Sequence, residues 1–424
     1  MKLSTPLVLA LFWHSVSAAW VTPKHTLNTA SGWKAEGFAS GLASPRGIIF
    51  DSAGNLLAVQ QGVGIVGFTL NTDGSAKSRT TVLSNTMLNH GIAFSADGKT
   101  IFASSSNTAW KWDYSASTMT MANQKKVVTG MINTDHVTRT LLVSTKSPNL
   151  VLVARGSNDN LDLGSVNATA ARAQVRVFDW TTLPAGDVGY DYNTQGKILA
   201  YGVRNEVGLV EDGAGNIWGV ENSADNLVRV KQGVTTDVHQ DNPGEKLHNF
   251  GPASVASSKY YGYPYCFSVW DPSLFPSSDS FSTGDWFVQS PTAGGIDGTW
   301  CDSTSGAIKP KMLFQPHAAP LDIKLGPGSD TNAYVSFHGS WNRSPPTGYK
   351  VVLVPGTRTT SGAWSQSGSL TGKALGYTDL LFNTNITACP NACFRPVGLA
   401  WNPAGTVLYV ASDGTGEIFA LQRT

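Results

Sequence analysis

A short phrase that recurs along the chain constrains the fold more than any other feature. In each copy an apolar run leads into a turn rich in Gly, Asp and Asn, and a second apolar run follows the turn. This order is typical of two antiparallel strands joined by a tight turn. The clear copies begin at Pro45, Asn89, Glu206 and Arg395, and looser copies cover residues 140–153 and 321–337.

Six copies of one phrase favour radial repetition of a sheet. The first two copies begin at Pro45 and Asn89, so they are about 44 residues apart, which is typical of one propeller blade. A β-sandwich is the alternative for a set of hairpins, but it does not require six copies of one phrase. No sustained helical periodicity is present. We therefore predict an all-β fold, a six-bladed β-propeller, in which the final run at 418–421 completes a blade begun near the mature N terminus.

The first 19 residues have the order of a secretory signal peptide. Lys2 precedes an apolar stretch from Leu7 to Trp13, and small residues follow up to a cleavage point near Ala19. The apolar stretch is much shorter than the roughly 20 residues of a membrane span. We therefore predict a secreted, extracellular protein with no membrane span. Its single propeller domain covers residues 20–424 and carries an insertion at about 251–310.

Charge and sequons narrow the possible partners. The net charge is +1 and charged residues make up 14% of the chain, without the basic stripe that a nucleic-acid partner requires. We therefore expect no nucleic-acid partner. Asn-x-Ser/Thr sequons at Asn167, Asn342 and Asn385 are expected on an exported glycoprotein.

Four cysteines, Cys266, Cys301, Cys389 and Cys393, lie late in the chain. Four cysteines allow three pairings. Secretion favours disulfides over a zinc site, and the spacing lacks the paired CxxC motifs of zinc ligands. We predict that sequence neighbours pair, as Cys266–Cys301 and Cys389–Cys393.

Polar segments lie where the first strand of a predicted blade meets the central channel. A single histidine or arginine at such a place is usually structural, but a propeller brings these strand ends together in one funnel. Guanidinium groups pair with carboxylates or phosphates, and histidine is a natural general base. The segments are Asp135–Arg139, Gly202–Glu206, His338–Arg343 and Phe394–Pro396. The funnel therefore predicts a site for an anionic ligand with a histidine base, for which Asp135 is a candidate orienting partner.

The same segments resemble those of a known family. The runs are DHVTR (135–139), GVRNEVG (202–208), ENSADNLVRV (221–230), HGSWNR (338–343) and FRPVGLAW (394–401). Together they resemble the glucose/sorbosone dehydrogenase family, and most closely its fungal quinone-dependent pyranose dehydrogenases, over about residues 34–424. The resemblance implies a six-bladed propeller that holds pyrroloquinoline quinone (PQQ) and calcium and oxidises sugars.

The resemblance also implies roles for individual residues. His136 matches the general base that takes the proton of the sugar hydroxyl, and Arg204 matches the arginine that hydrogen-bonds the quinone oxygens. The backbone carbonyls of Ser223 and Ala224 match the calcium ligands. Further cofactor contacts are expected from Asn205, His317, Trp341, Arg343 and Arg395.

Departures from the bacterial members bear on these roles. Bacterial members carry Gly-Pro where this chain has Ser223–Ala224. The blade-four phrase is also shorter here than in bacterial members, which affects the calcium ligands more than the quinone. Bacterial members also carry a cofactor-pairing lysine near Asn342 and Arg343. We expect that Arg343 substitutes for this lysine, or that Trp341 stacks on the cofactor. A glycan on Asn342 would block the funnel, so we expect that sequon to be unused.

The implied partners are a sugar substrate and an external electron acceptor, for which a cytochrome domain is a candidate. We expect the chain to be a monomer. One alternative is a non-catalytic secreted propeller that binds a glycan or a protein, and it predicts loss of the base or of the arginines. The second alternative is a calcium-dependent lactonase-type hydrolase. That chemistry needs acidic and Asn ligands from several blades, whereas the predicted funnel is more basic than acidic.

Overall fold

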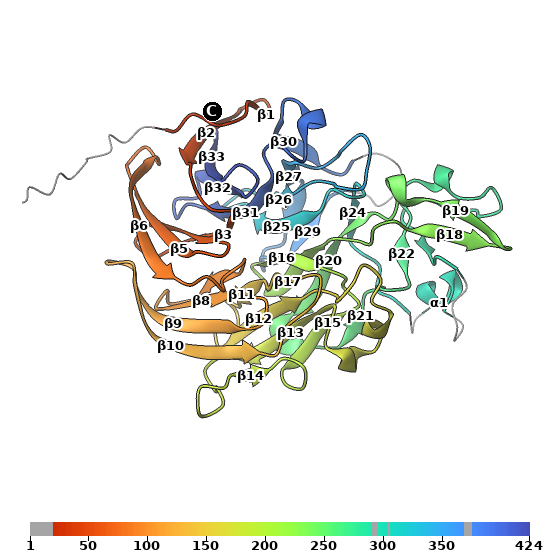
Figure 1. Cartoon of the computed structure of the whole chain (residues 1–424), viewed down its shortest axis with the longest axis horizontal. Coiled ribbons are helices and arrows are strands. Elements are labelled where there is room, and N and C mark those ends of the chain that lie inside the picture. The colour runs from red at the N-terminus through yellow and green to blue at the C-terminus, as the bar shows by residue number, and fades with distance from the viewer. Residues whose placement is uncertain (1–19, 291–295, 304–305, 369–374) are drawn as a thin grey trace, which may run out of the picture.

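The computed structural model describes residues 20–290, 296–303, 306–368 and 375–424. Within these residues six β-sheets form blades around a common axis (Figure 1). The predicted all-β, six-bladed propeller is therefore confirmed. No helix among the described residues is long and apolar enough to cross a membrane. The predicted signal peptide, residues 1–19, lies outside the described residues.

Each blade is a sheet of at least four strands, and the blades are numbered one to six in chain order. The innermost strands are β3 (Pro45–Phe50), β7 (Ile92–Phe94), β11 (Leu141–Val143), β16 (Glu206–Glu211), β25 (Pro320–Leu325) and β31 (Pro396–Trp401). The second strands are β4 (Leu56–Gln60), β8 (Thr100–Ser104), β12 (Leu150–Arg155), β17 (Asn216–Glu221), β26 (Ala333–Phe337) and β32 (Val407–Ser412). These twelve strands contain the paired apolar runs of the recurring phrase.

The outer half of each blade completes the sheet. The third strands are β5 (Gly64–Leu70), β9 (Ala109–Ser115), β13 (Gln174–Asp179), β20 (Glu245–Pro252), β27 (Lys350–Val354) and β33 (Glu417–Arg423). The fourth strands are β6 (Ala76–Ser84), β10 (Thr120–Thr129), β15 (Lys197–Tyr201), β24 (Met312–Phe314), β30 (Thr378–Asn383) and β2 (Trp33–Ala39). Short strands β14 (Tyr190–Asp191), β21 (Lys259–Tyr260) and β1 (Leu27–Thr29) extend blades two, three and five.

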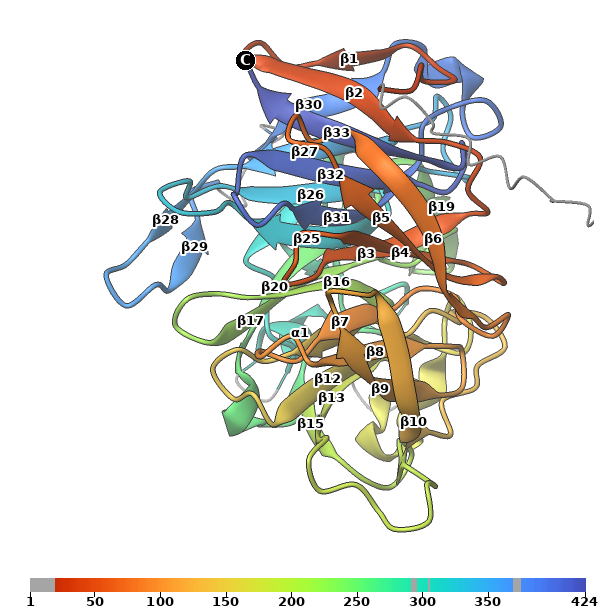
Figure 2. The ribbon, with the colours of Figure 1, turned by 90° about the vertical axis from the view of Figure 1, so that its left-hand side faces the viewer.

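The ring closes by pairing a strand from each end of the chain. β2 lies antiparallel to β33, with Trp33 opposite Arg423. The final run at 418–421 is part of β33, so it completes the blade that the N-terminal strand shares, as predicted. Figure 2 shows the blades from the side, with the ribbon of β28 (Gly356–Arg358) and β29 (Trp364–Gln366) projecting beyond the ring.

The turns of the recurring phrase follow from the chemistry of Asp and Gly. Asp51 Oδ1 accepts hydrogen bonds from the backbone N–H groups of Ala53 and Asn55, at 2.9 and 2.8 Å. Asp212 does the same in blade four. In the blade-one turn Gly54 has φ +82°, a conformation that glycine adopts without strain. The Asp-x-x-Gly pattern therefore makes a tight hairpin at the same point in both blades.

Apolar clusters fill the spaces between neighbouring blades. One cluster joins blades six and one, and includes Phe38, Phe68 and Tyr409. Similar clusters join each further pair of neighbouring blades around the ring, within the described residues. Side chains on the two faces of a strand point in opposite directions, so each blade packs against both of its neighbours. The core is therefore a closed ring that holds the inner strand ends in fixed positions.

The long connection from β20 to β24 carries the predicted insertion. It contains β21, the ribbon of β22 (Phe267–Ser268) and β23 (Trp286–Phe287), and α1 (Gly298–Asp302). The disulfide Cys266–Cys301 joins this ribbon region to α1, and Cys389–Cys393 closes a small loop before β31. Both predicted disulfides are therefore confirmed.

We expect the double variant Cys266→Ser/Cys301→Ser to lose about 3–4 kcal/mol of unfolding free energy, because this disulfide closes a loop with a sequence separation of 35. The double variant Cys389→Ser/Cys393→Ser should lose much less, since its loop spans a separation of only 4. Urea denaturation of both variants measures the difference. Equal losses would show that the two bonds do not stabilise the protein through loop closure.

Candidate functional site

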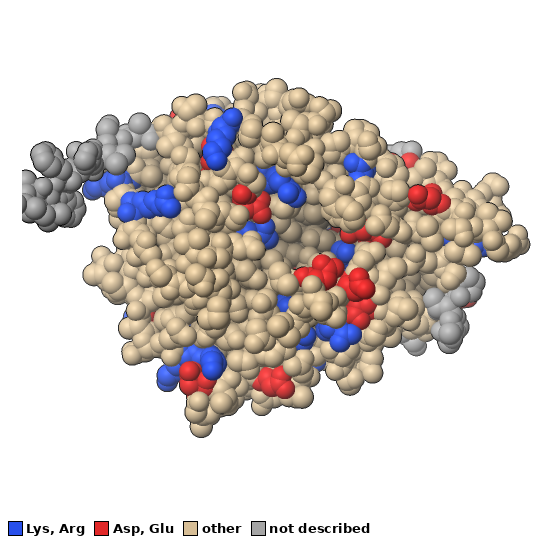
Figure 3. Space-filling view, in the orientation of Figure 1, with Lys and Arg blue, Asp and Glu red and all other residues tan. Residues whose placement is uncertain are grey.

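A cavity of about 440 Å³ lies at one end of the propeller axis. Figure 3 shows this view of the molecule hollowed near its centre, where acidic and basic side chains gather. The cavity brings together most of the predicted site residues, namely His136, Arg204, Asn205, Ser223, His317, Trp341 and Arg395. It is also lined by Asn160, Asn222, Asp225, Asn226, Glu245, His338 and Asn342.

Loops at one end of blades three to six supply these side chains. His136 precedes β11, Arg204 precedes β16 and His317 precedes β25. Arg395 stands directly before β31, and the His338 loop joins β26 to β27. Since the innermost strands all begin at the same end of the ring, segments far apart in sequence meet there.

His136 is the cavity histidine with a free ring nitrogen. Its Nδ1 atom lies 3.1 Å from the carbonyl oxygen and 3.0 Å from the hydroxyl oxygen of Ser157. No group of the described residues hydrogen-bonds its Nε2 atom. Burial and the charge of Arg204 lower the pKa of His136 to about 4, so the imidazole is neutral near neutral pH. His136 is therefore able to accept a proton.

Both ring nitrogens of His338 are already used. Its Nδ1 atom lies 3.1 Å from an Arg395 nitrogen, and a guanidinium can only donate. The Nδ1 atom therefore accepts, and Nε2–H donates to Asp413 at 2.8 Å. His338 aligns Arg395 and has no lone pair left for a substrate proton.

Both ring nitrogens of His317 face acceptor oxygens. Its Nε2–H donates to the backbone oxygen of His239 at 2.5 Å, and its Nδ1 atom lies 3.4 Å from an Asp225 oxygen. Burial lowers the pKa of His317, but the contacts with Asp225 and with the His239 carbonyl outweigh burial and raise it overall. Neither ring nitrogen of His317 is therefore open to a substrate proton.

Arg204 is held by several oxygen atoms at once. Its guanidinium donates to the carbonyl oxygen of Ser223 at 2.7 Å and to both oxygens of Asn160, and it pairs with Asp225 at 3.2 Å. Its backbone N–H donates to Glu221 at 3.0 Å. The side chain is only 5% exposed. A further contact joins the guanidinium to the Asn222 carbonyl, so Arg204 is a fixed, desolvated cation in the wall of the cavity.

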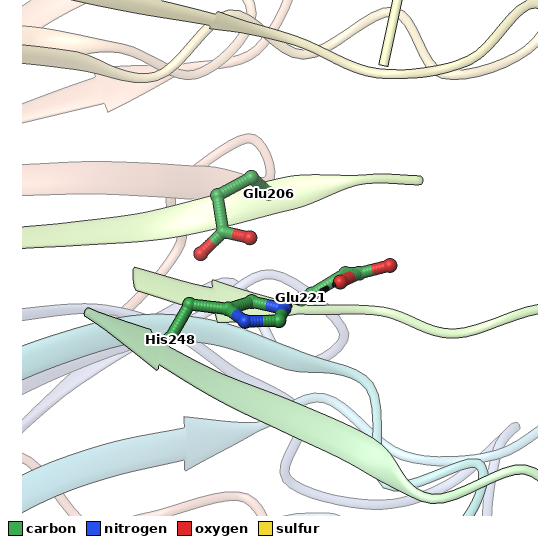
Figure 4. A group of neighbouring side chains, drawn as sticks. All are labelled: Glu206, Glu221 and His248. Atoms are coloured by element: carbon green, nitrogen blue, oxygen red, sulfur yellow. Dashed lines mark hydrogen bonds and ion pairs between the residues drawn. The ribbon is translucent and has the colours of Figure 1, made fainter. Parts of the chain in front are cut away.

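A buried charged cluster lies behind Arg204 in blade four, on three neighbouring strands (Figure 4). Glu221 accepts hydrogen bonds from Lys246 at 3.2 Å and from His248 at 2.7 Å. Burial raises the pKa of Glu221, but Lys246 and His248 outweigh it and bring the pKa to about 2. Burial and the charge of Glu221 raise the pKa of Glu206 well above its usual value. The Glu221 and Lys246 charges therefore offset one another, whereas both carboxyl oxygens of Glu206 are buried without a hydrogen-bond partner among the described residues.

The structure does not bring every predicted residue into the cavity. Arg343 is not among the lining residues, because its guanidinium pairs with Asp241 at 2.9 Å and donates to the carbonyl of Pro345. Ala224 is 1% exposed and packs in an apolar cluster with Tyr263, so it does not line the cavity either.

Asn342 is a cavity residue that we predicted only as an unused sequon. Both polar atoms of its side-chain amide are buried and have no hydrogen-bond partner among the described residues. Unpaired buried polar atoms are costly, so a ligand that pairs with this amide would be favoured. A buried amide is also a poor glycan position, although the absence of a glycan remains a prediction. Trp341 beside it is 68% exposed at the cavity mouth.

Sequence reasoning missed further residues that shape the site. Glu245 accepts hydrogen bonds from the backbone of Ser223 and of Ala319, and burial raises its pKa to about 7. Asn160 positions Arg204, and Asp413 orients His338. These residues come from blades three, four and six and carry no local signal. Glu206 and Glu221 stood within the quoted runs, so those runs could have drawn attention to them.

The fold and the site together define a class of protein: a six-bladed propeller whose axial cavity combines fixed arginines with one free imidazole. The chain belongs to the TrAA12-like family, whose model matches residues 27–424.

One relative is the pyrroloquinoline quinone-dependent pyranose dehydrogenase of Coprinopsis cinerea, which is 45% identical over 405 residues. The match covers 95% of this chain, and the chain spans only 55% of that relative's length.

Two solved structures resemble the chain closely. The holo form of the pyranose dehydrogenase PQQ domain from Coprinopsis cinerea superposes with a TM-score of 0.92 at 45% identity, covering 95% of this chain and 98% of that one. A calcium structure of the Trichoderma reesei carbohydrate-active enzyme family AA12 gives a TM-score of 0.87 at 39% identity, covering 96% of this chain and all of that one. The suspected relationship to fungal quinone-dependent pyranose dehydrogenases is therefore confirmed.

Proposed function

We propose that this chain is a PQQ-dependent dehydrogenase that oxidises sugars of the pyranose class. The observation that carries the proposal is that the cavity histidines differ in which ring nitrogens are already hydrogen-bonded. His338 and His317 have both ring nitrogens engaged, whereas His136 keeps Nε2 free in a cavity that also presents Arg204 and Arg395. The similarity to a PQQ-dependent pyranose dehydrogenase and to the PQQ domain of such an enzyme supports the same cofactor and substrate class.

The residues present fit an anionic quinone. Arg204 and Arg395 bring two guanidinium groups to a cavity that Asp135 and Asp225 also line, and guanidinium groups pair with carboxylates such as those of PQQ. The amide of Asn342 and the hydroxyl of Ser223 are buried without partners, so both are available to a bound group. The chemistry that PQQ supplies when bound is acceptance of a hydride equivalent from a sugar carbon.

His136 supplies the other half of the reaction. Its Nε2 atom accepts the proton of the sugar hydroxyl while the C–H bond of the same carbon loses a hydride. The positive charges of Arg204 and Arg395 lie beside the cavity and stabilise negative charge as it develops there. Because Arg204 is already held by Ser223, Asn160 and Asp225, little reorganisation is needed during the reaction.

Calcium dependence is part of the proposal, but the predicted ligand pair does not fit. The Ser223 carbonyl oxygen accepts from the Arg204 guanidinium, and a neighbouring cation disfavours a second one. Ala224 lies outside the cavity. Among the described lining residues, the side-chain oxygens of Asn205 and Asn226 are neutral donors of the type that calcium prefers.

We further propose that the protein is secreted, glycosylated and monomeric, and that it passes electrons to an external acceptor such as a cytochrome domain. The signal-peptide order of residues 1–19 and the sequons at Asn167 and Asn385 support secretion. The side chains of Asn167 and Asn385 do not line the cavity.

We expect the full chain to bind PQQ at micromolar concentration, and to bind it more tightly with calcium than with a chelator. Isothermal titration calorimetry with and without chelator measures both effects. Reduction of a dye acceptor by the loaded protein with several pyranoses then tests the reaction. No heat of binding at micromolar PQQ would refute the dehydrogenase function and favour a propeller that binds a glycan or a protein.

A further inference from the structure

We propose that Ser157 is a positioning residue that fixes the tautomer and the direction of the His136 imidazole. The tautomer follows from the contacts of this chain alone. Its catalytic consequence rests on the proposed function.

The contacts of Ser157 leave one place for the imidazole proton. The Ser157 carbonyl oxygen lies 3.1 Å from His136 Nδ1, and a carbonyl can only accept. The Ser157 hydroxyl donates its single proton to the carbonyl of Asp159 at 2.7 Å, so it also accepts toward Nδ1 at 3.0 Å. His136 Nδ1 therefore carries the proton. The lone pair of the neutral ring is on Nε2, which no described residue occupies.

Ser157 is itself held rigidly. It is fully buried, and its backbone N–H donates to the carbonyl of Arg204 at 2.7 Å. Asn133 donates to the carbonyls of both Ser157 and His136, and Arg155 holds Asn133 at 3.0 Å. Ser157 thus links the His136 imidazole to the main chain of Arg204.

Gly156 permits this close approach. A Cβ atom there would lie 2.6 Å from His136 Cβ and 2.7 Å from Asn205 Oδ1, distances that no side chain tolerates. The glycine lets the strand end run directly beneath the imidazole. The serine that follows is therefore placed against Nδ1 by the main chain.

Asp135 is a weaker partner than Ser157. Its carboxylate lies 3.7 Å from His136 Nδ1 and is 52% exposed. The other charged groups near the imidazole are Arg204 and Asp225, and Arg139 donates to the His136 carbonyl. The carbonyl and hydroxyl of Ser157 are neutral, so they orient the ring without adding charge to it.

Nuclear magnetic resonance of the full chain labelled with ¹⁵N-histidine tests the tautomer directly, without cofactor. We expect the His136 signal of the wild-type protein, assigned by its loss in His136→Ala, to show a protonated Nδ1 and an unprotonated Nε2. The same pattern should persist in Asp135→Asn. A wild-type Nε2–H tautomer, or loss of the pattern in Asp135→Asn, would overturn the proposal.

Steady-state kinetics of Ser157→Ala test the consequence. We expect kcat to fall about 10- to 100-fold with KM within about twofold, because the ring loses one of the two acceptors that aim it. Ser157→Thr keeps the hydroxyl and should restore most of kcat. Unchanged kcat in Ser157→Ala would refute the positioning role. If the protein binds no quinone, the proposed function fails, while the tautomer measurement still decides the assignment of Ser157.

Discussion

Replacing His136 with alanine is expected to lower turnover by about 10²–10⁴-fold, which is the usual contribution of a general base. Quinone affinity should remain near that of the wild-type protein, because Arg204 and Arg395 keep their own partners. Titration with PQQ, followed by dye reduction with several pyranoses, separates the two effects.

His239→Ala is the matched control for this experiment. Its imidazole pairs with Asp237 and does not line the cavity, so its removal should leave turnover within about threefold. A fall in turnover of only a few fold in His136→Ala would contradict the base assignment. It would show that the hydroxyl proton leaves by another route.

Turnover of the wild-type protein is expected to fall at acidic pH. Only the neutral imidazole accepts a proton, and burial together with the Arg204 charge lowers the pKa of His136 to about 4. Turnover should therefore be independent of this group above about pH 5, and fall as the pH drops through 4. A loss of activity centred near pH 6.5 would show that His136 titrates as an exposed histidine does.

Replacing Arg204 with alanine is expected to lower both quinone affinity and turnover. A buried charge pair that loses one partner costs about 2–5 kcal/mol, which corresponds to a loss of affinity of about 30- to 5,000-fold. The effect is large because Arg204 is 5% exposed and contacts Ser223, Asn160 and Asp225. Calorimetry with PQQ and dye-reduction kinetics measure the two losses.

Arg343→Ala distinguishes the two predicted arginines. The Arg343 guanidinium pairs with Asp241 outside the cavity, so we expect quinone affinity within about threefold of the wild-type value. Thermal unfolding of both variants controls for loss of folding. Similar losses of affinity in the two variants would show that the loop of Arg343 closes over the ligand.

The sequence predicted the propeller and many of the cavity residues because both leave local signals. Each blade begins with an apolar run, a turn and a second run, and in blades one and four Asp51 and Asp212 make the turn through contacts with residues two to four positions on. The two disulfides could be predicted from neighbouring cysteines. His136, Arg204 and Arg395 stand beside the inner strands, so the blade pattern alone places them at one end of the ring.

Only the tertiary structure decided which of those residues can accept a proton and which are held by other side chains. The ring brings Ser157 to His136, Asp413 to His338 and Asp225 to His317, from positions that are distant in sequence. These partners decide which imidazole keeps a lone pair. Long-range pairing likewise takes Arg343 out of the cavity and places the Arg204 guanidinium against the Ser223 carbonyl that was predicted to bind calcium. By itself the sequence determined the fold and the set of candidate groups, because strands and turns are encoded by near neighbours. The proton acceptor was decided only in the folded ring, because hydrogen-bond partners and burial come from segments that meet in space.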